Sequence, residues 1–434
     1  MKNIRKKLSV CGLTLLLFGQ SCTFDYPNPN ALTEEAALNN TQALLSVSLG
    51  LRARYTLGGA SALYSALNAN GLTTQELRVV NAGNADLAAL ELGGGTVTNL
   101  NPVVNNLWTG LNILNADCDR IIRNVGAISD PSTRNAVQAH AHLFKALAIG
   151  TMAQFWEQVP VTSVNFGQNA TFVPRREALQ TAVRLCDEAI TLIGTTTLPT
   201  TFTAALGTNL DLASCLNALS ARYNNMLGNQ EAAAAAAGRA SLMVRSQFVF
   251  NNVAQNPMFR SSFVTGNVTQ ARRSLGLAGA LAPAANDPRV AFYLTDPTAA
   301  TPNARGFFTA DGDPIPFYLP GEMLLIRAEA FARRNQLPEA ITELNRVLTK
   351  NNDPFGVNAN QAAYSGPQTQ ADVLLEIYRQ RCIELYLTGL KLEDSRRFGR
   401  PGPGQTGAER NRNFYPYPFT ERSNNPNTPN DPAN

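Results

Sequence analysis

Residues 320–348 read PGEMLLIRAEAFARRNQLPEAITELNRVL, and this stretch decides the fold. Its apolar residues recur at intervals of three and four positions, which places them along one face of an α-helix. One stripe ends before Asn335, and the next begins after Pro338, a residue that suits the first turn of a helix. We therefore expect two helices joined by a short polar turn. The two stripes are Leu324, Ala328, Phe331 and Ala332, then Ala340, Leu344, Val347 and Leu348.

The same pattern stands 108 residues earlier in the chain, around the short turn Gly228-Asn229-Gln230. Repeated hairpins with small and aromatic contact residues resemble tetratricopeptide units, which stack to bury a shared core. We expect a mainly α fold, in which a tetratricopeptide-like helical-repeat scaffold carries an irregular ligand-binding lobe. The matched positions are Leu216, Tyr223, Glu231 and Ala232 against Leu324, Phe331, Glu339 and Ala340.

The rest of the chain divides into helical and irregular stretches. Residues 56–103 and 245–319 are rich in Gly, Asn, Thr and Pro without a sustained period, and long irregular segments usually carry function. These two stretches form the predicted binding lobe. Residues 401–434, rich in Pro, Gly and Asn, are expected to run extended over the surface or to be disordered. Further helices are predicted at about 33–55, 104–125, 131–157, 175–194 and 371–390, within a helical scaffold of 33–55, 104–243 and 320–400.

The amino terminus has the order of a secretory signal. Four Lys and Arg residues precede an apolar stretch from Leu8 to Phe18, and Gly19-Gln20-Ser21 leads to Cys22. Eleven apolar residues are too few for a membrane span, which needs roughly 20. A small residue directly before a cysteine resembles a bacterial lipobox, although leucine is common where Gly19 stands. We expect residues 1–21 to be a lipoprotein signal peptide and Cys22 to be the lipid anchor.

The signal segment also accounts for the net charge. Without its four basic residues, the 36 Lys and Arg become 32 and balance the 32 Asp and Glu. No basic surface for nucleic acid follows, so we expect no nucleic-acid partner. Four cysteines remain after Cys11 and Cys22, and their spacing fits no zinc site. They are expected to be buried free thiols, namely Cys118, Cys186, Cys215 and Cys382.

Seven motifs, in order, resemble the SusD/RagB family of outer-membrane nutrient-binding lipoproteins. The strongest is Gly321–Ala330. Two positions depart from the family pattern: Thr388 stands where glutamate is usual, and Glu393 where an aromatic or apolar residue is expected, which predicts a rearranged charge network. The other motifs are Leu107–Ala116, Ala139–Ala148 with Phe155–Pro160, Asn256-Pro257, Asp287-Pro288-Arg289, Arg381–Leu385 with Gly389, Lys391, Asp394 and Arg397, and Tyr415–Pro418.

The resemblance implies a protein that is lipid-anchored in the outer membrane and faces the cell exterior. It implies a SusC-like TonB-dependent transporter as partner, over which the protein acts as a lid. It also implies that the protein hands an oligosaccharide, or in some cases a peptide, to the channel below. An alternative from another class is a helical-repeat scaffold lipoprotein that assembles other envelope proteins. A secreted hydrolase ranks third.

Ligand-binding residues are expected in the irregular lobe. Aromatic platforms would ordinarily reveal a sugar site, but Trp108 and Trp156 fall inside helical motifs and are predicted to lie in the core. A competing interpretation is that the two Phe residues of the set pack in the core and its polar residues are merely exposed. The set is Gln75, Glu76, Arg78, Asn81, Arg305, Phe307 and Phe308.

Catalysis has little support in the sequence. His140 and His142 stand two positions apart, which on a helix turns them about 200° from each other, so they cannot share a metal. No phosphate loop, nucleophile elbow or zinc-protease motif is present. We expect no enzymatic activity, no catalytic residues, no metal and no cofactor. Arg381 lies on an apolar stripe and needs a carboxylate partner if it is buried, for which Glu384 is a local choice.

Overall fold

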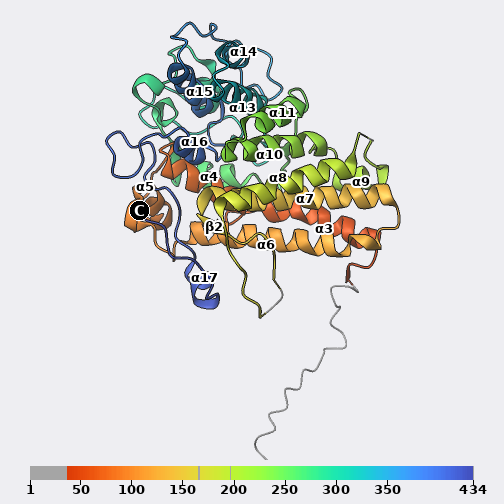
Figure 1. Ribbon diagram of the computed structural model, residues 1–434. Helices are drawn as coiled ribbons and strands as arrows, with labels where there is room; N and C mark the ends of the chain where they lie inside the picture. Colours follow the sequence, from red (N-terminus) through yellow and green to blue (C-terminus); the bar gives the residue numbers. More distant parts are fainter. Residues whose placement is uncertain (1–36, 165–166, 196, 434) are drawn as a thin grey trace, which may run out of the picture. The chain divides into compact units, whose positions relative to one another are not determined.

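Helical hairpins build the scaffold of this protein, seen in a computed structural model that describes residues 37–164, 167–195 and 197–433 (Figure 1). Residues 1–21 and Cys22 lie outside the described residues. By their internal contacts, residues 40–434 form one unit. Its helices are α3 (Thr41–Thr56), α4 (Ala62–Thr73), α5 (Ala85–Leu92), α6 (Pro102–Asn124), α7 (Pro131–Phe155), α8 (Arg175–Ile193), α9 (Thr200–Leu206), α10 (Leu212–Leu227), α11 (Gln230–Arg239), α12 (Pro288–Tyr293), α13 (Pro320–Arg333), α14 (Leu337–Leu348), α15 (Gln370–Glu384), α16 (Lys391–Arg397) and α17 (Phe419–Asn424).

Local chemistry explains where the helices begin and turn. Asn101 and Asp130 cap α6 and α7 by accepting backbone N–H bonds, and each is followed by a proline at the first helical position. Gly228 ends α10 in the left-handed conformation (φ 80°), which a glycine adopts without steric cost. The chain then reverses directly into α11. The predicted helical hairpin at this turn is confirmed.

Neighbouring helices pack in series along the scaffold. Helix α7 lies between α6 and α8, α8 packs on α10, and the α10/α11 hairpin packs on the α13/α14 hairpin, as Figure 1 shows. The predicted stripes of α13 and α14 meet in one buried cluster, which α15 completes with Val373 and Ile377. The mainly α, tetratricopeptide-like fold class is confirmed.

Three parts differ from the sequence prediction. The stretch 56–103 contains α4 and α5; every residue of α4 is buried, and a helix buried on all sides shows no amphipathic period. Helix α15 ends at Glu384 rather than near residue 390, because the chain turns through Leu387 at φ 54°. The tail is neither loose nor wholly extended, since it contains α17 and buries Tyr415 and Tyr417.

The tail is fastened to the scaffold through aromatic residues. Tyr415 donates from its backbone N–H to the carbonyl of Phe155 (2.8 Å). The indole of Trp156 donates to the Pro416 carbonyl (3.0 Å) and lies 4.9 Å from the ring of Trp108. Both tryptophans are buried, as predicted. The proline-rich end therefore closes the aromatic core instead of crossing the surface.

The described part of the chain contains three pairs of short antiparallel strands, and one of them joins the irregular stretch 245–319 to the stretch 56–103. Strand β1 (Leu77–Val79) pairs antiparallel with β5 (Thr269–Ala271), which joins the two stretches of the predicted lobe. The remaining antiparallel pairs are β2 (Gln158–Val159) with β3 (Val173–Pro174) and β4 (Gln247–Phe248) with β6 (Ile315–Pro316). Among the residues that the structure describes, no helix is both long and apolar enough to cross a membrane.

A buried charge network ties α15 and α16 to the scaffold. Arg381 forms a bidentate pair with Asp394 (2.8 and 3.0 Å), so the local choice of Glu384 is wrong. Glu384 instead accepts a hydrogen bond from Arg289 (3.0 Å). The carboxylate of Glu384 is thus taken by Arg289, and α16 brings Asp394 to the guanidinium of Arg381. Glu393, one of the two departures from the family pattern, is buried and pairs with Arg175 and Arg396.

This network predicts a loss of stability in acid. Burial works to raise the pKa of Glu329, but the guanidinium of Arg397, 2.7 Å away, outweighs it and lowers the pKa from 4.5 to about 2. A lowered folded-state pKa stabilises the protein above pH 4.5, and this contribution is lost as the pH falls through 2. We expect a loss on the order of 3 kcal/mol from Glu329, measured by urea unfolding between pH 6 and pH 2. Glu329→Gln should flatten this slope, whereas Glu188→Gln, at an exposed ion pair, should leave it unchanged.

Candidate functional site

The seven residues predicted to bind a ligand do not meet at one place. Gln75 follows α4 with φ 62°, is half-buried, and donates from its side chain to the Ala408 carbonyl (3.3 Å). Arg78 lies in β1 and donates to the side chain of Gln270 on β5 (3.0 Å). Asn81 is exposed in the following turn, where it accepts from the Gly83 N–H. Gln75 also lines a cavity.

Glu76 does not face a ligand, which corrects its assignment to the binding set. It is 1% exposed, and its two carboxylate oxygens accept from Asn70 (2.9 Å) and from the Leu387 N–H (3.2 Å). Burial raises its pKa, and the charge of Lys391 opposes this shift. The side chain holds the end of α4 against the turn after α15. Its role is structural.

Phe307 and Phe308 are also corrected, because both are buried. Phe308 packs on Phe263, and Phe307 packs on Tyr293. Together they line only a small hole of about 60 Å³ in the interior. The competing interpretation of two core phenylalanines is correct. Arg305, two residues before Phe307, is exposed at the surface.

A larger hollow, which we name the lobe cavity, opens beside Gln75 and has a volume of about 520 Å³. It lies where the two irregular stretches, α16 and the tail come together. Its walls combine backbone from tight turns with a few charged and apolar side chains. Those walls are Thr74-Gln75, Gly276–Leu281, Leu375, Lys391, Arg400 and Gly407–Glu409.

A close backbone crossing shapes one wall of the lobe cavity. Gly276 has φ 71°, and a Cβ at this position would lie 1.9 Å from the carbonyl oxygen of Gln75. Only glycine fits there. This crossing continues the β1/β5 pairing and holds the segment 276–281 against the end of α4. The cavity wall is therefore fixed by backbone contacts rather than by side-chain packing.

The two cations that line the lobe cavity, Arg400 and Lys391, have different surroundings. Arg400 pairs with Glu409 (2.7 Å) and lies over the ring of Tyr378, whose hydroxyl donates to Glu409. Lys391 is the first residue of α16 and is 5% exposed. Sequence reasoning placed Lys391 in a family motif and missed its position in a cavity. The sequence did contain an indication, because a lysine is unfavourable at the first position of a helix, where the helix dipole is positive. Its presence there suggests a role other than helix stabilisation.

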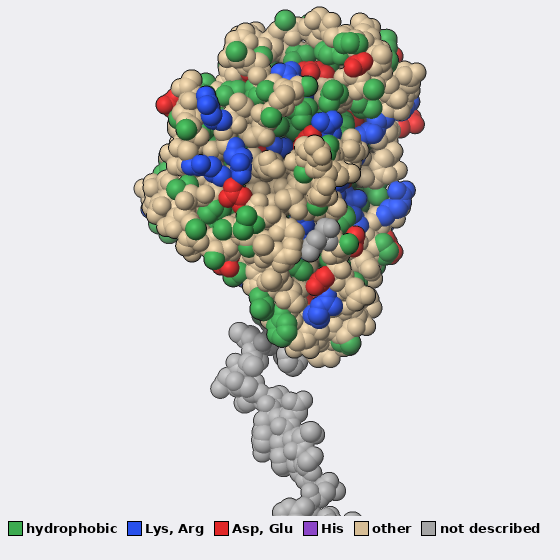
Figure 2. All heavy atoms as spheres, turned by 90° about the vertical axis from the view of Figure 1, so that its left-hand side faces the viewer, with side chains coloured by type: hydrophobic (Ala, Val, Ile, Leu, Met, Phe, Trp, Pro, Cys, Tyr) green, Lys and Arg blue, Asp and Glu red, His purple; other side chains and the backbone are tan. Residues whose placement is uncertain are grey.

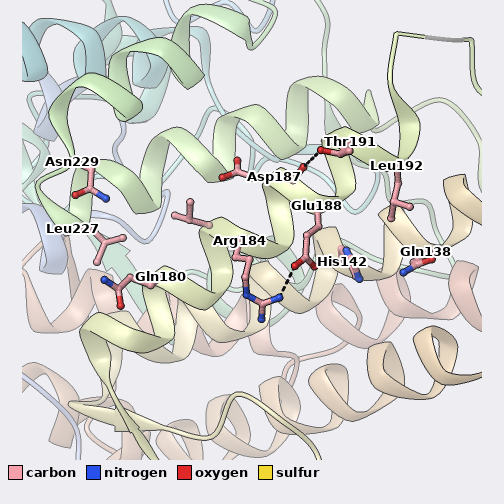
Figure 3. Close-up of a pocket in the computed structure, with 11 residues that line it drawn as sticks. Gln138, His142, Gln180, Arg184, Asp187, Glu188, Thr191, Leu192, Leu227 and Asn229 are labelled. Carbon is pink, nitrogen blue, oxygen red and sulfur yellow. Dashed lines mark hydrogen bonds and ion pairs between the residues drawn. The ribbon is translucent and has the colours of Figure 1, made fainter.

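A second hollow of about 620 Å³, which we name the helix groove, lies on the scaffold between α7, α8 and the turn after α10 (Figure 3). Its charges are largely satisfied within the groove. Arg184 donates to Glu188 (2.6 Å), and Asp187 accepts from Ser220 (3.3 Å). His142 reaches the groove from α7; burial lowers its pKa, and its Nδ1 has no hydrogen-bond partner among the described residues. A ligand in the groove would therefore meet side-chain amides and the Arg184–Glu188 ion pair rather than an unpaired charge.

The remaining reactive side chains form no centre in the part of the chain that the structure describes. Cys118, Cys186, Cys215 and Cys382 are buried free thiols, as predicted, and burial raises the pKa of Cys382 to about 12. Within the described ranges, no three His, Cys, Asp or Glu residues group closely enough to hold a metal ion. On the face shown in Figure 2, the side chains of Lys, Arg, Asp and Glu are interspersed without a large area of one sign.

A known family matches the carboxyl-terminal part of the chain, which forms most of the walls of the lobe cavity. The SusD family profile matches residues 251–433, which include segment 276–281, α16 and the tail. The carboxyl-terminal part of this chain is thus similar to the SusD family. No curated protein matches its sequence. The motifs from Gly321 onward that resembled the family lie inside the matched residues.

Solved structures of SusD-type proteins share the fold over nearly the whole chain. A SusD superfamily protein from Bacteroides thetaiotaomicron superposes with a TM-score of 0.70 at 12% identity, covering 91% of this chain and 100% of its own. A SusD-like carbohydrate binding protein from Bacteroides fragilis gives 0.69 at 14% identity, with 91% and 100% covered. A SusD superfamily protein from Bacteroides vulgatus gives 0.66 at 14% identity, with 90% and 98% covered. At these identities the likeness shows the fold.

Proposed function

We propose that this chain is a surface lipoprotein that binds a nutrient and delivers it to a TonB-dependent outer-membrane transporter, over which it acts as a lid. The preferred ligand class is an oligosaccharide, and the alternative is a peptide. The lobe cavity carries this proposal, because it is a hollow of ligand size in a fold shared with a B. fragilis protein named for carbohydrate binding. Small-molecule sites have volumes of about 300–1,000 Å³.

The chemistry of the lobe cavity suits a hydroxylated ligand. The amide of Gln75 and the Arg400–Glu409 pair offer donors and acceptors, while Leu277 and Leu375 supply apolar surface. A sugar presents both kinds of surface, with hydroxyls around its ring edge and C–H groups on its face. Of the seven residues predicted from the sequence, we retain Gln75 as a ligand contact. Arrays of oligosaccharides and of peptides, probed with the purified chain, test the ligand; binding to neither contradicts it.

The proposed role needs no catalytic step. The ligand is captured and released unchanged, so the protein requires only a site with reversible contacts. We therefore propose a non-enzymatic protein without a cofactor. A purified chain that hydrolyses a bound saccharide or peptide, and loses this activity on replacement of one carboxylate, would favour the hydrolase alternative instead.

The anchor is proposed from the sequence, since residues 1–21 and Cys22 lie outside the described residues. Cys22→Ala is expected to abolish fatty-acid labelling and to release the protein from the membrane fraction. The reason is that a thiol at the first mature residue is the proposed lipid attachment point. Labelling with a radioactive or alkyne-bearing fatty acid, followed by fractionation, measures both effects. Cys11→Ala, inside the proposed signal peptide, is the matched control and should leave labelling intact; a Cys22→Ala protein that still carries lipid would remove the anchor from the proposal.

The second candidate function is a helical-repeat scaffold that assembles other envelope proteins. The helix groove favours it, because it offers a concave surface on the repeats themselves. The two functions differ in the partner they require. The transporter function requires one large β-barrel, whereas the scaffold function requires several envelope proteins and no barrel.

A further inference from the structure

The lobe cavity contains a cation without a contact partner. Lys391 lines the cavity while its side chain is almost completely buried. Among the described residues, no carboxylate forms an ion pair with its ammonium group, and no acceptor takes a hydrogen bond from it. The other cation of the wall, Arg400, is already paired with Glu409. The ammonium group of Lys391 therefore lines the cavity without an anion in contact with it.

Two carboxylates in the neighbourhood of Lys391 are engaged elsewhere. Glu76 feels the charge of Lys391, but both of its oxygens bind the protein, one to Asn70 and one to the Leu387 N–H. Asp394, on the same helix as Lys391, binds the guanidinium of Arg381. Neither side chain is placed to neutralise the ammonium directly. The negative charges of Glu76 and Asp394 therefore act on Lys391 from a distance, but neither carboxylate contacts its ammonium group.

Such a position is costly in the absence of an anionic ligand. A buried ammonium loses hydration that only a contacting anion or hydrogen-bond acceptor replaces. An anion that enters the cavity and contacts the ammonium group would replace that hydration.

We propose that Lys391 binds the carboxylate of an acidic sugar, so that the ligand of the lobe cavity is a uronate-containing oligosaccharide. This inference rests on the proposed function, since it names the ligand class of the same site. A carboxylate fits better than a phosphate, because one free ammonium balances one negative charge, whereas a phosphate monoester carries about −1.5 to −2 at pH 7. The rest of the sugar meets the amide of Gln75 and the backbone of segment 276–281.

The test compares acidic saccharides with their own neutral forms. Short oligomers of galacturonate, glucuronate and alginate are each titrated calorimetrically against the full chain in detergent, beside the same oligomers with their carboxyl groups reduced to alcohols. At least one acidic oligomer should bind about tenfold or more tightly than its reduced form, as expected for a charge-assisted hydrogen bond. Lys391→Met should bring the acidic oligomer to the affinity of the reduced form, and Lys391→Arg should keep the preference.

Two controls keep the result independent of folding. Thermal melting shows whether Lys391→Met is folded. If it is not, the wild-type comparison of acidic and reduced oligomers still tests the ligand class, and Lys391→Arg, which keeps the charge, tests the position. Ala280→Trp, at an exposed position on the cavity wall, should block binding of both forms without touching the buried lysine.

Three results overturn the inference. They are equal affinity of every acidic oligomer and its reduced form, an acidic preference that survives Lys391→Met, and binding of acidic peptides in place of all uronates. In each of these the proposed nutrient-binding function stands. If neither saccharides nor peptides bind the wild-type chain at all, the proposed function fails together with the inference.

Discussion

Replacing Arg289 with alanine is expected to lower the free energy of unfolding by about 3–5 kcal/mol, the usual effect of removing one partner from a buried ion pair. Arg289 is completely buried and joins two parts of the fold. Its guanidinium donates to Asp287 (2.7 Å), which caps α12, and to Glu384 (3.0 Å), at the end of α15. Without it, two buried carboxylates lose their common cation. Lys350 still reaches Glu384, but Asp287 keeps only its backbone contacts.

Urea unfolding, followed by circular dichroism, measures this effect. Arg184→Ala is the matched control, because Arg184 also pairs with a glutamate but in an exposed position, where such pairs contribute about 0–1 kcal/mol. The ligand affinity of folded Arg289→Ala protein should stay near that of the wild type, since Arg289 does not line the lobe cavity. Equal midpoints for Arg289→Ala and Arg184→Ala would show that the network does not hold the lobe to the scaffold.

Gly150→Ala is expected to destabilise the protein by about 1–3 kcal/mol, as overpacking of a core does. Gly150 lies inside α7, where a Cβ would stand 2.1 Å from a carbon of the Tyr223 ring on α10. Tyr223 is completely buried, so its ring could move only by displacing its neighbours in the core. Alanine would otherwise favour the helix by about 1 kcal/mol, so the clash decides the sign.

The matched control for this change is Gly50→Ala. Gly50 also lies inside a helix, α3, but it is exposed and no atom lies within 4 Å of its added Cβ. Gly50→Ala should therefore raise the free energy of unfolding by up to about 1 kcal/mol. Opposite signs for the two variants, measured by urea unfolding, support close packing of α7 on α10. Stabilisation by both would contradict it.

The sequence predicted the scaffold because its helices are amphipathic. The stripes of α13 and α14 have the period of a half-buried helix, and the turn at Gly228 carries the residue that the left-handed conformation requires. Helix α4 was not predicted, because it is buried on every side and so has no amphipathic pattern. The tail was misjudged from its composition, since Pro and Asn content says nothing of the aromatic contacts made by Tyr415 and Tyr417.

The binding site was harder to predict than the fold. Glu76 and Phe308 stand in irregular segments and have the chemistry of ligand contacts, but long-range packing buries both. Lys391 shows the converse, because a helical scaffold motif brings it to a cavity wall formed in part by segments more than 100 residues away along the chain. The local sequence predicts neither the burial of Glu76 and Phe308 nor the position of Lys391 at a cavity. Both depend on which segments meet after folding.

The proposed nutrient-binding lipoprotein has three parts: a lipid at Cys22, a scaffold of helical hairpins, and a lobe cavity that presents a nutrient to a channel. The structure shows the fold, and residues 251–433 match the SusD family model; the anchor, the ligand and the channel are proposed. Of these, the channel is the central claim, because it distinguishes uptake from the assembly of envelope proteins. A lid without a channel would have no function.

Purification of the tagged full chain from its own membranes in mild detergent tests that claim most directly. The proposed function predicts one dominant partner, a TonB-dependent β-barrel transporter, at a fixed ratio to the chain. Cys22→Ala should reduce its recovery, because the released protein is no longer held beside the barrel. Recovery of several soluble or periplasm-facing envelope proteins without any β-barrel would contradict the uptake function and favour the scaffold.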